Sequence, residues 1–277
     1  MTLNTLQRLA ENAAVSAGKT ILQKQQQELQ ITIKNGGESL ASQVLTDADI
    51  ASQQIILDAL APTLSKYNLG LLTEESEDDQ SRFSKDYFWC IDPLDGTLPF
   101  TEGKDGFAVS IALISKDGTA VLGVVYDPKH QQLFTANVHS TLLLNDAPIT
   151  KNRDANQFYW NMDRSLLKTD DFKAFRKKVE QHCLTYNLEL IETNHQGAVM
   201  NACSLLQCTN GIYFKPPKTN LGGGSIWDYA ASSCLFHLAN HTATSFNGSA
   251  LKLNEQSTFM NEQGVMFSVG NGLDIRW

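Results

Sequence analysis

Residues 87–100 read YFWCIDPLDGTLPF, and this stretch decides the fold. Its first five residues are aromatic or aliphatic strand formers in a run too short for a buried helix, so they predict a core strand. Pro93 interrupts strand pairing directly after Asp92, and Gly96 allows the backbone to turn. We therefore expect two carboxylates, Asp92 and Asp95, to lie together at the end of a buried strand.

The backbone N–H groups around Gly96 and Thr97 are expected beside these two acids. Such a site suits a divalent cation with a phosphate, because the cation neutralises the acids while the amides hold the anion. An Asp-Pro and Asp-Gly turn without any ligand explains the same residues, since this turn chemistry is common. The stretch alone leaves both interpretations open.

Three motifs in order resemble the inositol monophosphatase superfamily of magnesium-dependent, lithium-sensitive phosphatases. They are DPLDGT at residues 92–97, the upstream pair Glu74–Glu75 and the downstream pair Trp227–Asp228. The resemblance extends from the first helix to the last strand. It implies an α+β fold, the layered αβαβα sandwich of this type of sugar phosphatase.

The resemblance also implies one compact unit with two halves. Residues 1–151 form an N-terminal α+β half with most metal ligands. Residues 152–277 form a C-terminal α/β half that carries Asp228 and a loop on the substrate side. A homodimer is a further expectation from the family.

By the same resemblance, Mg²⁺ is the cofactor, with two or three ions per active site. The first ion would be held by Glu74, Asp92 and the carbonyl of Leu94. The second would be held by Asp92, Asp95 and Asp228, so Asp92 would bridge the ions. Every donor in this set is an oxygen, which is the ligand type that magnesium prefers.

The resemblance implies that Glu74 and Thr97 orient and activate the attacking water, that Asp49 aligns Thr97, and that the amides of Gly96 and Thr97 hold phosphate. Asp49 also has a local explanation, because it stands three residues after Thr46 as in a capping box. Asp228 likewise falls in the first turn of a predicted helix, where the helix dipole favours a carboxylate. For both aspartates the resemblance favours the functional interpretation.

Composition narrows the possible partners. The 277 residues carry a net charge of −8, which argues against a nucleic-acid polymer as the main ligand. No apolar run is long enough to span a membrane, and the first residues lack the pattern of a secretory signal. Five scattered cysteines are expected to be reduced, so a cytoplasmic location is expected.

The sequence predicts a small phosphorylated substrate but leaves its identity open. Leu98–Phe100 matches neither the T-N-F typical of inositol phosphatases nor the K-E-F typical of bisphosphate nucleotidases. Gly197–Cys203 has the nucleotidase spacing, with Asn201 where a lysine is expected. Lys215 and Lys218 could bind a second phosphate, whereas residues 221–224 lack the acid that binds inositol hydroxyls.

The favoured prediction is a 3'(2'),5'-bisphosphate nucleotidase that converts 3'-phosphoadenosine 5'-phosphate to AMP, with Gly197, Asn201, Lys215 and Lys218 binding substrate. The alternative is an inositol-1-phosphate phosphatase or another sugar phosphatase. An alternative of another class is a regulatory or interaction protein with vestigial phosphatase activity.

Hydrophobic spacing and turn residues predict the remaining elements. Helices are expected at 3–30, from 46 toward 62, at 172–184, at 197–208 and after Ser225. Strands are expected at 29–33 (ending before Gly36–Gly37), 69–73, 107–114, 120–126, 132–136, 141–144, 188–192, 211–215 and 265–269.

Overall fold

The computed structural model describes residues 2–27, 31–33 and 44–275. Within them the helices are α1 (Leu3–Gln25), α3 (Asp47–Tyr67), α4 (Thr97–Thr101), α5 (Phe172–Tyr186), α6 (Ala198–Cys203) and α7 (Ile226–Leu238). Four 3-10 helices are η1 (Ser81–Phe83), η2 (Leu166–Lys168), η3 (Ser204–Gln207) and η4 (Gly270–Asp274). A short antiparallel pair, β1 (Ile31–Ile33) and β2 (Val44–Thr46), precedes α3.

The first sheet has seven strands in chain order, and all its pairings are antiparallel except that of β3 with β4. Its strands are β3 (Gly70–Thr73), β4 (Tyr87–Asp95), β5 (Ala108–Ser115), β6 (Ala120–Asp127), β7 (Gln132–Asn137), β8 (Leu143–Leu144) and β9 (Ala147–Pro148). The register of β4 against β5 shifts between Asp92 and Asp95. This irregularity contains Pro93, which has no N–H to contribute to a ladder.

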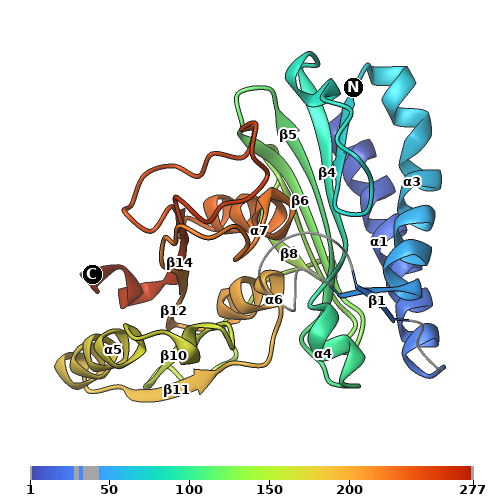
Figure 1. Cartoon of the computed structure of the whole chain (residues 1–277). Coiled ribbons are helices and arrows are strands. Elements are labelled where there is room, and N and C mark those ends of the chain that lie inside the picture. Colours follow the sequence, from blue (N-terminus) through green and yellow to red (C-terminus); the bar gives the residue numbers. More distant parts are fainter. Residues whose placement is uncertain (1, 28–30, 34–43, 276–277) are drawn as a thin grey trace.

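Helices cover both faces of this sheet (Figure 1). On one side α1 and α3 bury aliphatic and alanine side chains against Trp89, Ile91 and their neighbours. On the other side α7 packs closely, because Gly123 has no side chain. A Cβ at Gly123 would lie 2.6 Å from the carbonyl oxygen of Ala231. The sheet is therefore buried on both faces, which explains the apolar run at the start of β4.

The second sheet has five strands in the order β11-β10-β12-β14-β13, with β10 parallel to both β11 and β12. The strands are β10 (Gln157–Asn161), β11 (Glu189–Thr193), β12 (Asn210–Lys215), β13 (Thr242–Thr244) and β14 (Val265–Val269). Helix α5 covers its outer face through a cluster that includes Trp160, Phe172 and Phe214. The strands change sheet between Pro148 and Gln157, and the expected boundary at residues 151 and 152 falls in this connection.

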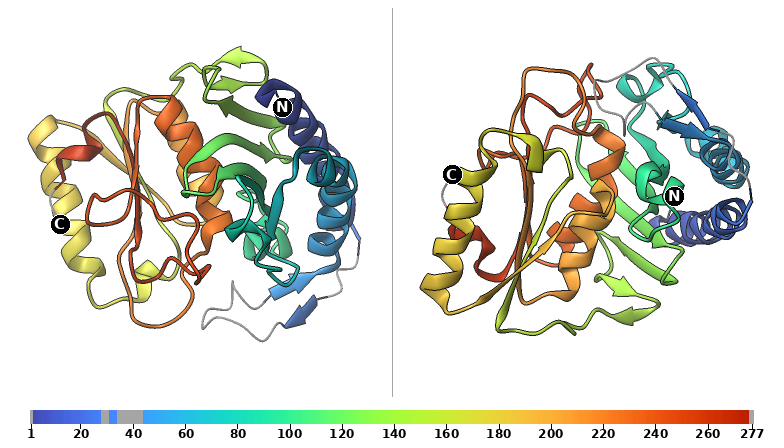
Figure 2. Two further views of the ribbon diagram at one scale, coloured as in Figure 1. Left: turned by 90° about the horizontal axis from the view of Figure 1, so that it is seen from above. Right: turned by 60° about the horizontal axis from the view of Figure 1, so that its bottom comes forward.

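The layers follow one another as α1 and α3, first sheet, α6 and α7, second sheet, and α5 (Figures 1 and 2). The predicted α+β class and αβαβα sandwich are thus confirmed. No helix in the described ranges is long and apolar enough to cross a membrane.

Two predicted helix ends are wrong. The first helix stops at Gln25 rather than near residue 30, and the predicted helix 197–208 changes to a 3-10 turn after Cys203. In the second case Cys208 has extended backbone, which leads the chain into β12. Pro62 lies inside α3, which continues until Asn68 adopts a left-handed conformation. Leu29, Gly36 and Gly37 lie outside the described residues.

Candidate active site

The end of β4 holds two of the predicted ligands. Asp92 and Asp95 are 1% and 6% exposed, respectively. The Leu94 N–H donates to Oδ1 of Asp92 at 3.0 Å, so the turn is closed by this carboxylate. Gly96 then adopts a positive φ of 83°, which favours glycine, and begins α4.

Asp228 reaches the same place from the first turn of α7. The N–H of Ser225 donates to its Oδ2 at 2.6 Å, and the two residues form a capping box. Ligand atoms of Asp92, Asp95 and Asp228 lie within 4.8 Å of one another. The capping role and the place in this acidic cluster therefore belong to the same side chain and do not exclude each other.

The electrostatics of the acidic cluster require a positive partner. Burial raises the pKa of Asp92 well above its ordinary value, and the charges of Glu74, Asp228 and Asp95 raise it further. Burial and Asp228 also raise the pKa of Asp95. Oδ2 of Asp92 is buried and has no hydrogen-bond partner among the described residues. A donor set of buried carboxylate oxygens with an orphaned oxygen fits a hard divalent cation such as Mg²⁺.

Glu74 follows β3, which runs parallel to β4. Its backbone N–H donates to the carbonyl of Ile91 at 3.2 Å, so it is held beside Asp92. Its side chain lies outside the group whose atoms fall within 4.8 Å, yet its charge raises the pKa of Asp92. The parallel pairing of β3 with β4 thus brings the first predicted ligand to the cluster.

Asp49 and Thr97 also meet, at the opposite side of the turn. Oδ2 of Asp49 accepts from the N–H of Thr46 at 2.8 Å and from its hydroxyl at 2.6 Å, which completes the capping box of α3. The Thr97 hydroxyl lies 3.5 Å from Oδ1 of Asp49 and 3.3 Å from the Leu94 carbonyl. Asp49 is therefore both a helix cap and a neighbour of Thr97.

Asp95 is held by the second half of the chain. The N–H groups of Ala198 and Val199 donate to its two oxygens at 3.0 and 2.9 Å. Gly197 permits this contact, because a Cβ there would lie 2.2 Å from Oδ2 of Asp95. Sequence reasoning missed these amides. The small residues of the Gly197–Cys203 segment were the available signal.

Of the residues predicted to bind substrate, Asn201 and Lys215 contact Asp163, whereas Lys218 lies on an exposed loop. Asn201 is fully buried, and its Nδ2 donates to Asp163 at 3.0 Å and to the Gln196 carbonyl at 3.3 Å. Lys215 pairs with Oδ2 of Asp163 at 2.6 Å. Lys218 is exposed on the following loop, where its N–H donates to the Asn261 carbonyl.

Asp163 was not predicted, although it organises this side of the site. Asn161 pairs with Tyr213 across β10 and β12, so Asp163 and Lys215 lie at equivalent positions two residues beyond. The Tyr213 hydroxyl donates to Oδ1 of Asp163 at 3.2 Å. No motif surrounds Asp163, and only strand register shows that it meets Lys215.

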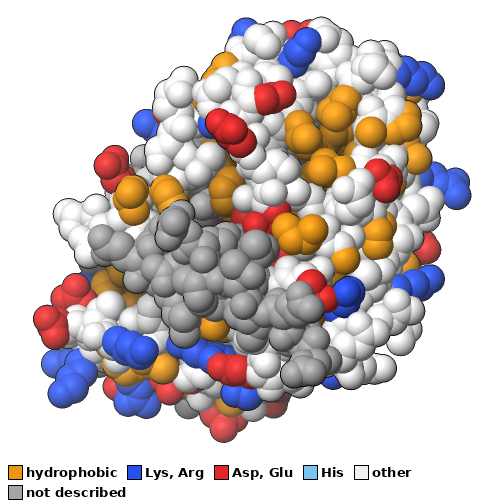
Figure 3. All heavy atoms as spheres, turned by 45° about the vertical axis from the view of Figure 1, so that its right-hand side comes forward, with side chains coloured by type: hydrophobic (Ala, Val, Ile, Leu, Met, Phe, Trp, Pro, Cys, Tyr) orange, Lys and Arg blue, Asp and Glu red, His pale blue; other side chains and the backbone are white. Residues whose placement is uncertain are grey.

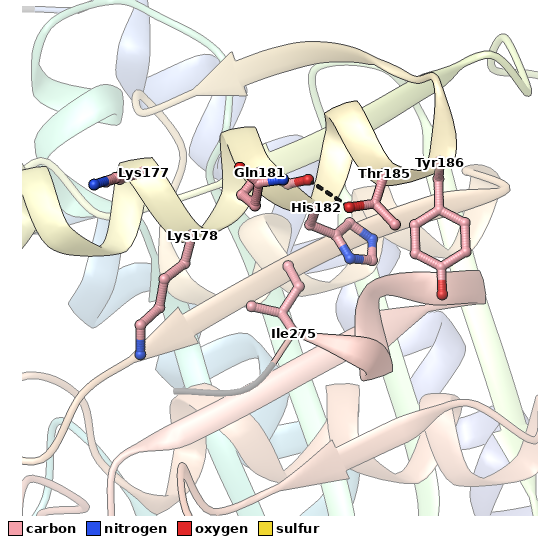
Figure 4. A pocket seen from close by; sticks show the side chains of 7 residues that line it. All are labelled: Lys177, Lys178, Gln181, His182, Thr185, Tyr186 and Ile275. Carbon is pink, nitrogen blue, oxygen red and sulfur yellow. Dashed lines mark hydrogen bonds between the residues drawn. The ribbon is translucent and has the colours of Figure 1, made fainter.

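Two surface hollows formed by described residues lie away from the acidic cluster. One of about 470 Å³ is lined by α5 residues and Ile275, on the outer side of the second sheet (Figure 4). Another follows α1 beside β7 and β8. Neither contains a residue of the acidic cluster. We therefore place the candidate site by its chemistry rather than by the size of a hollow.

Charge on the face of Figure 3 is mixed. Among the described residues visible there, acidic and basic side chains are interspersed, and hydrophobic side chains gather over part of the face. The view shows no continuous basic area among these residues.

A layered αβαβα fold with this acidic cluster defines a class of protein, and comparison with known sequences shows which family this chain belongs to. A sequence model of the inositol monophosphatase family matches residues 2–269. The chain belongs to this family.

Relatives extend over most of the chain. It is 30% identical to the Nus factor SuhB of Pasteurella multocida over 254 residues, which cover 89% of this chain and 87% of that protein. It is 29% identical to an inositol-1-monophosphatase of Synechocystis over 91% of this chain and 82% of that protein. The solved structure of SuhB from Bartonella henselae superposes with a TM-score of 0.72 at 21% identity, covering 98% and 96% of the two chains.

Proposed function

We propose that this protein is a Mg²⁺-dependent phosphatase that hydrolyses a small phosphomonoester. The observation that carries the proposal is the cluster of Asp92, Asp95 and Asp228, in which one buried oxygen of Asp92 accepts no hydrogen bond from the part of the chain that the structure describes. When bound, Mg²⁺ ions neutralise developing charge and generate a nucleophile from water at neutral pH. Two or three ions are proposed from the family resemblance.

The protein's own residues would divide the remaining work. Glu74, Asp92, Asp95, Asp228 and the Leu94 carbonyl would hold the ions. Thr97, beside Asp49, and Glu74 would orient the attacking water, and the Glu74 carboxylate would accept its proton. The N–H groups of Gly96 and Thr97 would hold phosphate oxygens. Because these donors belong to the backbone, no flexible side chain has to become ordered when phosphate binds.

Phosphate release by the purified protein tests this reaction. We expect hydrolysis with Mg²⁺, none with EDTA, and inhibition by lithium as the family resemblance implies. Three substrates span the candidates: 3'-phosphoadenosine 5'-phosphate, inositol 1-phosphate and fructose 1,6-bisphosphate. Absence of turnover on all three would contradict the proposal for these substrate types.

We infer that the substrate carries a second anionic group, and 3'-phosphoadenosine 5'-phosphate is the candidate. The support is Lys215, which ends β12 and has an 18% exposed side chain paired with Asp163. Burial lowers the pKa of Lys215, but the nearby Asp163 and Asp228 carboxylates raise it by more, so its ammonium stays charged. Its charge in turn lowers the pKa of Asp95 and Asp228, as expected for a cation beside the cluster. Gly197 and Asn201 would act indirectly, through Asp95 and Asp163.

A matched pair of nucleotides tests the role of Lys215. The nucleotides 3'-phosphoadenosine 5'-phosphate and 3'-AMP carry the same 3'-phosphate on the same nucleoside. They differ only in the 5'-phosphate, which 3'-AMP lacks. Lys215→Met should reduce kcat/KM for the bisphosphate by about 10- to 100-fold more than for 3'-AMP, as expected for loss of a charged hydrogen bond. Lys218→Met, on the exposed loop that follows β12, is the control for a lysine further from the acidic cluster and should change neither. An equal loss on both nucleotides would show that Lys215 does not read the second phosphate.

Inositol phosphate is the alternative substrate, because several relatives are named inositol-1-monophosphatase. In this chain the position seven residues before Asp228 is Leu221, which is 53% exposed and has no hydroxyl-binding group. A preference for inositol 1-phosphate over the bisphosphate nucleotide would favour this alternative.

A regulatory function is the alternative from another class, because other relatives are named Nus factor SuhB. Asp95→Asn separates the two classes of function. If a cellular phenotype of gene deletion is rescued by this variant although phosphate release is lost, the regulatory function is favoured. If rescue needs turnover, the phosphatase is favoured.

A further inference from the structure

The first turns of α3 present three polar side chains to the ends of β3 and β4. Asp49, Ser52 and Gln53 stand at positions i, i+3 and i+4, so they share one helix face. Ser52 and Gln53 are 0% and 7% exposed. Polar side chains at such burial need hydrogen-bond partners, and their partners lie at the acidic site.

Both the oxygen and the nitrogen of the Gln53 side-chain amide form hydrogen bonds to residues on either side of Glu74. Its Oε1 accepts from the Thr73 hydroxyl at 2.5 Å and from the Glu75 N–H at 3.2 Å. Its Nε2 donates to the Glu75 carbonyl at 3.1 Å and to the Ser76 hydroxyl at 2.9 Å. The residues on both sides of Glu74 are therefore tied to one buried side chain.

Ser52 makes the corresponding contact on the neighbouring strand. Its hydroxyl donates to the Pro93 carbonyl at 2.6 Å, between Asp92 and Leu94. One helix face thus contacts the segments that carry Glu74 and Asp92. Because α3 is a rigid element, it adds a second constraint to the pairing of β3 with β4, which already joins these segments.

We propose that Gln53 is a positioning residue that holds Glu74 at the distance from Asp92 at which both can bind one divalent cation. The inference rests on the proposed function in one respect, namely that Glu74 is a metal ligand. Without Gln53, the turn after β3 keeps the Glu74 N–H contact to Ile91 but loses the contacts to the residues on both sides. The backbone on both sides of Glu74 would then be less constrained when the ion binds.

Metal affinity, measured without turnover, tests the proposal. Gln53→Met keeps an unbranched side chain of similar length and removes all four hydrogen bonds. We expect the dissociation constant for Mn²⁺, followed by the electron paramagnetic resonance signal of the free ion, to rise about 10- to 100-fold, as for other residues that orient metal ligands. Gln54→Met is the matched control, because Gln54 is exposed and pairs with Asp58. It should leave the Mn²⁺ affinity unchanged.

The dependence of activity on Mg²⁺ gives a readout that simple destabilisation would not reproduce. Gln53→Met should need more Mg²⁺ for half-maximal activity, while kcat at saturating Mg²⁺ recovers to near the wild-type value. Mn²⁺ affinity within twofold of wild type, or a loss of kcat that saturating Mg²⁺ does not recover, would overturn the positioning role.

Thr73→Val provides a second test if Gln53→Met does not fold. It removes only the hydroxyl that donates to Gln53 and should raise the Mn²⁺ dissociation constant several-fold, whereas an unchanged constant would overturn the proposal.

The positioning role of Gln53 and the proposed phosphatase activity can fail separately. Weakened Mn²⁺ binding in Gln53→Met without hydrolysis of any substrate would leave the positioning role and remove the phosphatase. Phosphate release by the wild-type protein together with unchanged Mn²⁺ binding in Gln53→Met would leave the phosphatase proposal and remove the positioning role of Gln53.

Discussion

Two groups of buried charges in this molecule are built in opposite ways. Arg82 is fully buried, and its guanidinium donates to Asp78 at 2.8 Å, to the Asn254 side chain at 2.7 Å and to the Glu255 carbonyl at 2.8 Å. It also stacks 4.0 Å from the centre of the Phe83 ring. The charge of Arg82 is therefore neutralised and hydrogen-bonded within the protein.

The acidic cluster has the reverse arrangement. Asp92, Asp95 and Asp228 bring carboxylate oxygens within 4.8 Å of one another, and within residues 2–27, 31–33 and 44–275 Oδ2 of Asp92 has no hydrogen-bond partner. Burial and neighbouring carboxylates raise the pKa of Asp92 and Asp95, and carboxylates perturbed in this way are typical of functional sites. The comparison indicates that Arg82 joins two parts of the chain, whereas the acidic cluster is prepared for a cation.

The largest effect is expected for Asp92→Asn. The amide can still accept from the Leu94 N–H, but the substitution removes the charge of a proposed metal ligand. We expect kcat/KM to fall by at least about 100-fold, while the metal-free protein melts at a higher temperature because like-charge repulsion is relieved. Phosphate release and thermal melting with EDTA measure the two effects. Full activity in this variant would remove Asp92 from the proposed site.

Arg82→Met should have the opposite pattern. The variant removes the cation that pairs with Asp78 and the donor that serves Asn254 and Glu255, so we expect a loss of about 3 kcal/mol in unfolding free energy. The melting temperature should fall by roughly 6–12 °C. The kcat at saturating Mg²⁺ should stay near wild type. Lys85→Met, which removes a surface contact to Asn68, is the control and should cost less than about 0.5 kcal/mol. A selective loss of kcat in Arg82→Met would break the contrast between the two regions.

The pH dependence should give the smallest effect and sharpen the contrast. Burial and neighbouring charges raise the pKa of Asp92, Asp95 and Asp228 in the folded protein, so the folded state binds more protons than the unfolded state above the ordinary aspartate pKa. The metal-free protein should therefore lose stability as pH rises from that ordinary value toward the raised ones, and regain it as pH falls. Melting with EDTA between about pH 5 and pH 8 measures this slope, which should be shallower in Asp92→Asn.

Added Mg²⁺ should reverse this trend, because cation binding requires ionised carboxylates. The increase in melting temperature on adding Mg²⁺ should be larger at the upper end of this pH range than at the lower end. An increase that is independent of pH would place the ion away from these three aspartates.

The predicted ligands could be read from local patterns. DPLDGT, Glu74–Glu75 and Trp227–Asp228 are short motifs whose turn and capping chemistry places carboxylates at the ends of strands and helices. The structure brings three of these acids together and places Glu74 beside them. Their roles in binding metal and activating water stay predictions.

The supporting residues could not be read in this way. Gln53 lies in a helix beside Gln54, and from the sequence both are ordinary polar helix residues. Only the packing of α3 on the sheet buries the first and exposes the second. Asp163 lacks any motif, and it meets Lys215 because β10 and β12 pair in a particular register.

The sequence by itself therefore determined the core strand that carries Asp92, the capped starts of α3 and α7, and the family, whereas β4 continues through an irregularity to Asp95 rather than ending at Asp92 as predicted. Each of these depends on residues within a few positions of one another. The tertiary structure decided which of these ends meet. Asp95 is held by amides 103 and 104 residues further along, and Arg82 by groups 172 and 173 residues away. Contacts at such separations depend on how whole layers pack, because no local backbone preference acts over that distance.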